Sequence, residues 1–76
     1  MDAKQLVIKL LGEYLDLAEE DINFEADLIE ETGVDPGVLV ELVGKAGAQM
    51  GVSIPDEEIE KVRTVQDLVN LLENYG

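Results

Sequence analysis

Histidine and cysteine are absent from this 76-residue chain, and serine occurs once, as Ser53. These absences remove the commonest general base, the thiol nucleophile, disulfides and the usual zinc ligands. Ser53 has no histidine to activate it. The sequence therefore predicts no catalytic residue, no dedicated metal-binding residue and no enzymatic activity.

Basic residues are scarce. Five Lys and Arg stand against 18 Asp and Glu, which gives a formal net charge of −13. Such a field repels the phosphates of nucleic acids and anionic lipids, so neither is an expected partner. It attracts a basic protein surface and speeds encounter with it. The simpler interpretation is that the charge keeps the chain soluble and monomeric.

Long hydrophobic runs are also missing. The chain has no stretch of about 18 apolar residues, so the sequence predicts no membrane span. The sequence opens with Met1-Asp2-Ala3-Lys4 and an amphipathic pattern, without the apolar stretch of a signal peptide. We therefore expect a cytoplasmic protein.

Aromatic residues are few, and aliphatic residues dominate. Tyr14, Phe24 and Tyr75 are the only aromatic residues, while 46% of the chain is hydrophobic. Leu, Val, Ile and Ala at this density, in a chain of this length, are typical of a compact helical bundle. The sequence predicts one all-α domain over residues 1–76.

Four helices are expected from caps and periodicity. The first runs from about Asp2 to Leu15, with an apolar stripe at helical spacing that comprises Leu6, Val7, Leu10, Leu11, Tyr14 and Leu15. A long loop follows over residues 16–34, in which isolated apolar residues act as anchors: Leu17, Ile22, Phe24, Leu28 and Ile29. One short helical turn is expected within it.

The later helices have clear start and stop signals. Asp35-Pro36 opens the second helix, which continues through Met50 to a glycine stop at Gly51. A short third helix fits residues 55–60. Thr64 and Asp67 cap the fourth, whose buried face consists of Val65, Leu68, Val69, Leu71 and Leu72.

Three strings of sequence carry a resemblance to a known family: VIKLLGEYL, ADLIEETGVDPGVLVELV and SIPDEEIEKVRTVQDLV. Over nearly the whole chain, and without insertion or deletion, the sequence resembles the acyl carrier proteins. The resemblance implies a four-helix bundle with three longer helices, a short third helix and a long first loop. It also implies a role in fatty-acid, polyketide or related biosynthesis.

One position departs from the family. Members have Asp-Ser-Leu at the start of the second helix, and the serine carries 4′-phosphopantetheine. This chain has Asp35-Pro36-Gly37. Pro36 has no hydroxyl for the phosphodiester, and Gly37 lacks the apolar side chain that the modifying transferase contacts. No bound cofactor is therefore expected at this position.

The resemblance also implies a partner-binding surface that faces a basic enzyme or regulatory protein. Asp35, Glu41, Asp56 and Glu60 match acidic residues that partners contact in the family. Gly44 and Gly47 lower helix stability, and the functional interpretation is that they form, with Ala48, a smooth strip for close approach of a partner. Packing within the bundle is the alternative. Val38 is a further candidate contact.

Three functional hypotheses remain open at this stage. The chain can be a carrier-like binding or regulatory protein that is not itself modified. Alternatively, it can be a working carrier that is modified elsewhere, with Ser53 as the attachment point, or a paralogue without carrier function.

Overall fold

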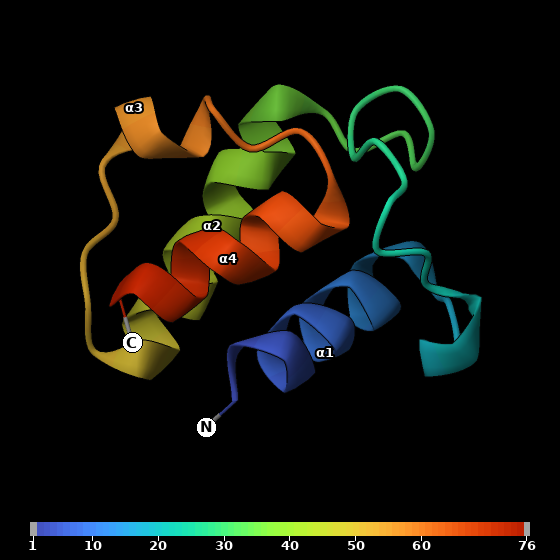
Figure 1. Ribbon diagram of the computed structural model, residues 1–76, viewed down its shortest axis with the longest axis horizontal. Helices are drawn as coiled ribbons and strands as arrows, with labels where there is room; N and C mark the ends of the chain where they lie inside the picture. Colours follow the sequence, from blue (N-terminus) through green and yellow to red (C-terminus); the bar gives the residue numbers. More distant parts are fainter. Residues whose placement is uncertain (1, 76) are drawn as a thin grey trace.

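The computed structural model describes residues 2–75, and these form helices without a strand (Figure 1). The elements are α1 (Ala3–Leu15), the 3₁₀ turn η1 (Glu19–Asp21), α2 (Pro36–Met50), α3 (Asp56–Ile59) and α4 (Val65–Tyr75). This arrangement confirms the all-α, carrier-like bundle with a short third helix and a long first loop. Within the described residues, no helix has both the length and the apolar character to cross a membrane.

The helices begin and end at the residues that the sequence indicates. The Asp2 carboxylate accepts a hydrogen bond from the Lys4 N–H at 3.1 Å, and so caps α1. Thr64 and Asp67 bond reciprocally, each side chain accepting from the other's backbone N–H, which is a capping box before α4. Gly51 ends α2 with φ of 77°, a conformation that glycine adopts without strain.

The core lies between α1, α2 and α4, and the first loop adds to it. The innermost side chains are aliphatic and come from all of these segments: Leu6, Val7, Leu11, Leu28, Val34, Val43, Val65 and Leu72. The predicted apolar face of α4 is buried throughout. Close packing of these branched side chains is the main source of stability in a domain that has no cysteine for a cross-link.

Two apolar residues that were expected inside lie at the surface, and those predictions are wrong. Tyr14 is 47% exposed and Leu17 is 39% exposed. Tyr14 lies on the side of α1 that lines an open groove with Lys45 of α2. Asp16 has a left-handed conformation with φ of 56°, which turns the chain out of α1 and leaves Leu17 outside the core.

The first loop is held by backbone pairing with the segment that opens α4. Leu28 N–H donates to the Arg63 carbonyl at 2.8 Å, and Gln66 N–H donates to the Phe24 carbonyl at 2.8 Å. Val65 N–H donates to the carbonyl of Ala26 at 3.2 Å. These bonds satisfy backbone groups that a long loop would otherwise leave unpaired, and they fix Leu28 in the core.

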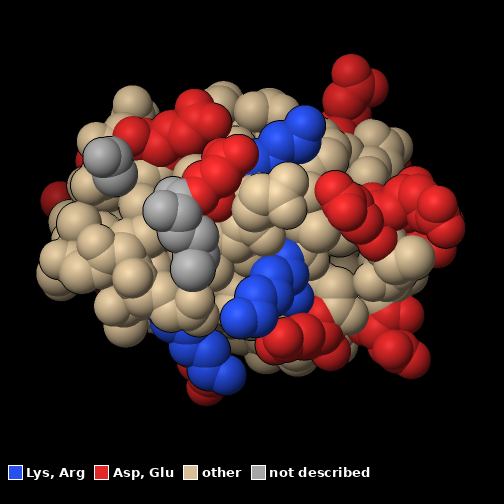
Figure 2. Space-filling view, turned by 90° about the horizontal axis from the view of Figure 1, so that it is seen from below, with Lys and Arg blue, Asp and Glu red and all other residues tan. Residues whose placement is uncertain are grey.

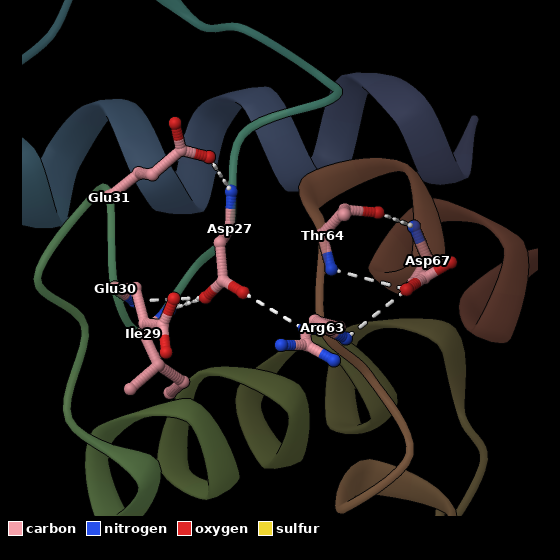
Figure 3. A network of polar contacts seen from close by, with 7 residues as sticks. All are labelled: Asp27, Ile29, Glu30, Glu31, Arg63, Thr64 and Asp67. Carbon is pink, nitrogen blue, oxygen red and sulfur yellow. Dashed lines mark hydrogen bonds and ion pairs between the residues drawn. The ribbon is translucent and has the colours of Figure 1, made fainter.

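Asp27 adds a side-chain network to this backbone pairing (Figure 3). One carboxylate oxygen accepts from the N–H groups of Ile29 and Glu30, both at 2.9 Å, while the other lies 3.2 Å from Nε of Arg63. Glu31 in turn accepts from the Asp27 N–H at 2.6 Å. The hydrogen bond from Glu30 N–H is the main cause that lowers the pKa of Asp27, and the Arg63 guanidinium adds to it, while partial desolvation opposes the shift.

We predict that Asp27→Asn lowers the melting temperature at about pH 7. Because folding lowers the pKa of Asp27 below its ordinary value of 3.8, the ionised form favours the folded state above about pH 4. That contribution is lost as the pH falls through the lowered pKa. Melting curves across this range should show the difference between wild type and variant shrinking with acid.

Glu73→Gln is the control, because Glu73 is an exposed carboxylate of α4. It should not lower the melting temperature at neutral pH. A difference between Asp27→Asn and wild type that stays constant down to about pH 2 would contradict the assigned role of the Asp27 charge.

Candidate functional site

The start of α2 is built by three consecutive residues. Asp35 occupies the N-cap, and its carboxylate accepts from the Gly37 N–H at 2.9 Å. Pro36 takes the first helical position, where a backbone N–H would have no partner within the helix. The turn is therefore well formed, and all three residues are exposed.

Pro36 stands where the resemblance places the phosphopantetheine attachment. Its exposed side chain has no hydroxyl, and the carboxylate of the preceding residue, Asp35, is already engaged in capping. The residues at this position do not fit an attached phosphopantetheine. Ser53 is exposed as well, but it lies beyond the far end of α2, a helix about 22 Å long.

A groove opens beside Pro36, between the start of α2 and α3. It has a volume of about 370 Å³. Pro36, Gly37 and Glu60 line it, together with aliphatic side chains that include Ile29, Val40, Ile59 and Val62. We name this depression the α2–α3 groove.

The acidic residues of the expected partner surface are accessible. Glu41 on α2 and Asp56 and Glu60 at α3 are exposed, and Glu60 also lines the α2–α3 groove. Asp35 is exposed at the same end of α2, although its carboxylate already accepts a backbone hydrogen bond. An apolar groove that is lined by one carboxylate, between helices that carry further exposed carboxylates, can accept a cationic surface with an apolar side chain.

The remaining candidates do not share one environment. Val38 is half-buried and packs against the core, so only part of its side chain is accessible; its role as a partner contact stays a prediction. Gly47 is buried, and a Cβ atom there would lie 2.8 Å from the carbonyl oxygen of Val52. Its role is packing within the bundle, as the alternative interpretation held. Gly44 is exposed, and a Cβ there would meet nothing within 4 Å.

The structure brings no metal site together. Within residues 2–75, no group of three or more carboxylates is arranged to hold an ion. The acidic residues of α3 follow one another in its first turn. In the first loop, the Glu31 carboxylate accepts a hydrogen bond from the Asp27 N–H.

We predict opposite effects on stability for alanine substitutions at the two α2 glycines. Gly47→Ala should lower the free energy of unfolding by about 1–3 kcal/mol, because the added methyl would force apart α2 and the chain that follows it. Gly44→Ala should raise it by up to about 1 kcal/mol, because the site is open and alanine favours the helix. Urea denaturation of both variants measures the pair, and equal effects would contradict this assignment.

Comparison with protein families agrees with this geometry. Residues 5–72 match the family model described as a phosphopantetheine attachment site, so the match spans most of the chain. Carrier domains of this family are not catalytic themselves. As a small helical domain of this family, the chain is a non-enzymatic domain. With its fold and this match taken together, the chain belongs to the phosphopantetheine-binding family of acyl-carrier-like domains.

Proposed function

We propose that this domain is an acyl-carrier-like binding or regulatory protein of a fatty-acid, polyketide or related pathway. It acts in the cytoplasm and is not itself phosphopantetheinylated. The observation that carries the proposal is Pro36, an exposed residue without a hydroxyl at the attachment position of a well-formed helix start.

The charge distribution supports a basic partner. Exposed Glu41, Asp56 and Glu60 lie around the α2–α3 groove or on the helices that form it. A partner with basic residues would be attracted to this face, and an apolar side chain of that partner would gain by entering the groove. The domain would then bind the enzymes or regulators of a carrier pathway without delivering a thioester.

The first test is the intact mass of the protein after incubation with coenzyme A and a broad-specificity phosphopantetheinyl transferase. The wild-type mass should stay unchanged. A Pro36→Ser, Gly37→Leu double variant restores both the hydroxyl and the apolar residue beside it. It should gain the mass of one phosphopantetheine, which shows that the transferase was active.

A functional carrier with an unusual attachment point is the alternative, and Ser53 is its candidate. Ser53 is exposed and is the only serine of the chain. In that case, the wild-type protein would gain the mass of one phosphopantetheine, and the Ser53→Ala variant would keep its original mass. This result would overturn the proposed function.

We further predict that Glu41→Lys and Asp56→Lys each weaken binding of a partner recovered by cross-linking from native cells. Each reversal introduces repulsion from a basic surface, and the expected loss of affinity is about tenfold. Calorimetric titration measures it. Glu73→Lys makes the same charge change on α4 and should leave the affinity nearly unchanged. Equal affinities of all three variants for the partner would rule out the surface of Glu41 and Asp56 as its binding site.

A further inference from the structure

A second apolar groove lies on a different part of the molecule. It has a volume of about 370 Å³ and shares no lining residue with the α2–α3 groove. Its apolar walls come from the end of α1, the first loop and the start of α4: Leu11, Leu15, Leu17, Ile22, Ala26 and Val65. We name it the first-loop groove. Nothing in the α2 start or in Pro36 contributes to it.

The local backbone places an apolar side chain at the mouth of this groove. Asp16 adopts the left-handed conformation, and the Leu17 N–H then donates to the Gly12 carbonyl at 3.1 Å. A Cβ at Gly12 would lie 3.1 Å from the Leu17 carbonyl oxygen, so the glycine permits this close approach. Leu17 is one of two large hydrophobic residues that are exposed in the described chain.

Carboxylates lie at this groove, and no Lys or Arg among the described residues lines it. Asp21 and Glu31 line it, and Glu19 and Glu20 are exposed on the same turn as Asp21. Figure 2 shows acidic side chains gathered at the right-hand end of the visible face, where Figure 1 places the loop after α1, and no basic side chains are visible there.

The five cations of the chain have other positions in the structure. Lys61 and Arg63 pair with Glu58 and Asp27, respectively. Lys4 lies 5.1 Å from the centre of the Phe24 ring, and two lysines line the groove between α1 and α2: Lys9 and Lys45. None of the five lines the first-loop groove.

We propose that the first-loop groove is a second docking surface, whose occupant is a basic peptide segment with one large apolar side chain. The aliphatic walls would enclose the apolar side chain, and the carboxylates of η1 would pair with flanking lysines or arginines. The volume lies within the range of small binding pockets, which suits one anchor residue. The domain could then contact two basic surfaces at once.

The test uses two synthetic peptides and isotope-labelled protein observed by NMR. One peptide is acetyl-Lys-Lys-Phe-Lys-Lys-amide, and the other replaces its phenylalanine by serine. The first should shift the amide signals of Leu17, Ile22 and Ala26 through contact with the aromatic ring. The second, with the same charge, should bind at least about tenfold more weakly because it lacks the anchor.

Two variants test the groove itself. Leu17→Ser removes apolar surface from its mouth, and Asp21→Lys reverses a lining charge; each should weaken binding of the phenylalanine peptide about tenfold. Glu73→Lys makes the same charge change on α4 and should alter affinity by no more than about twofold. Melting curves verify that the variants are folded.

Three results would overturn this proposal. Equal binding of both peptides would mean that charge alone attracts them. Signal shifts confined to the α2–α3 groove would mean that the first-loop groove is not used. Concentration-dependent dimers that Leu17→Ser abolishes would identify a second copy of the chain as the occupant. None of these results depends on whether Pro36 prevents modification.

Discussion

The pairing of the first loop with the segment that opens α4 is the constraint on which the arrangement of this domain depends. Three backbone hydrogen bonds and the Asp27–Arg63 ion pair join residues at least 35 positions apart in sequence. They hold Leu28 in the core and fix the route by which the chain enters α2. Both grooves are formed in part by residues of this loop, Ile29 in one and Ile22 in the other.

The start of α2 shows how a fold can persist while the chemistry of one position changes. Helix initiation needs a capping carboxylate and a residue that tolerates the first position, and Asp35-Pro36 supplies both. Covalent attachment needs an exposed hydroxyl, which proline does not have. The two requirements are physically separate, so Pro36 can satisfy the first without a hydroxyl for the second.

Sequence reasoning predicted the helices well because their signals are local. Asp35, Gly51 and the Thr64–Asp67 box act within a few residues of their own positions, and the structure places them as expected. It failed for Tyr14 and Leu17, because helical spacing does not show where α1 meets its neighbours or that Asp16 turns the chain.

The candidate site was predictable only in part. Charged residues such as Glu41 are expected at the surface, and the structure exposes them. Gly47 was not assigned from sequence, because its role depends on how closely the carbonyl of Val52 approaches it once the cap at Gly51 turns the chain back over the last turn of α2. The grooves and the Asp27 network depend on tertiary contacts between distant segments, so no local pattern indicates them.

The brevity of α3 has a consequence for motion. The helix has four residues, of which Ile59 alone is buried, and Val62 follows as the next buried side chain. Little apolar surface must be exposed to detach it, so its opening costs less free energy than unfolding of α1, α2 or α4. The wall of the α2–α3 groove that α3 supplies is therefore expected to open more easily than the wall that α2 supplies.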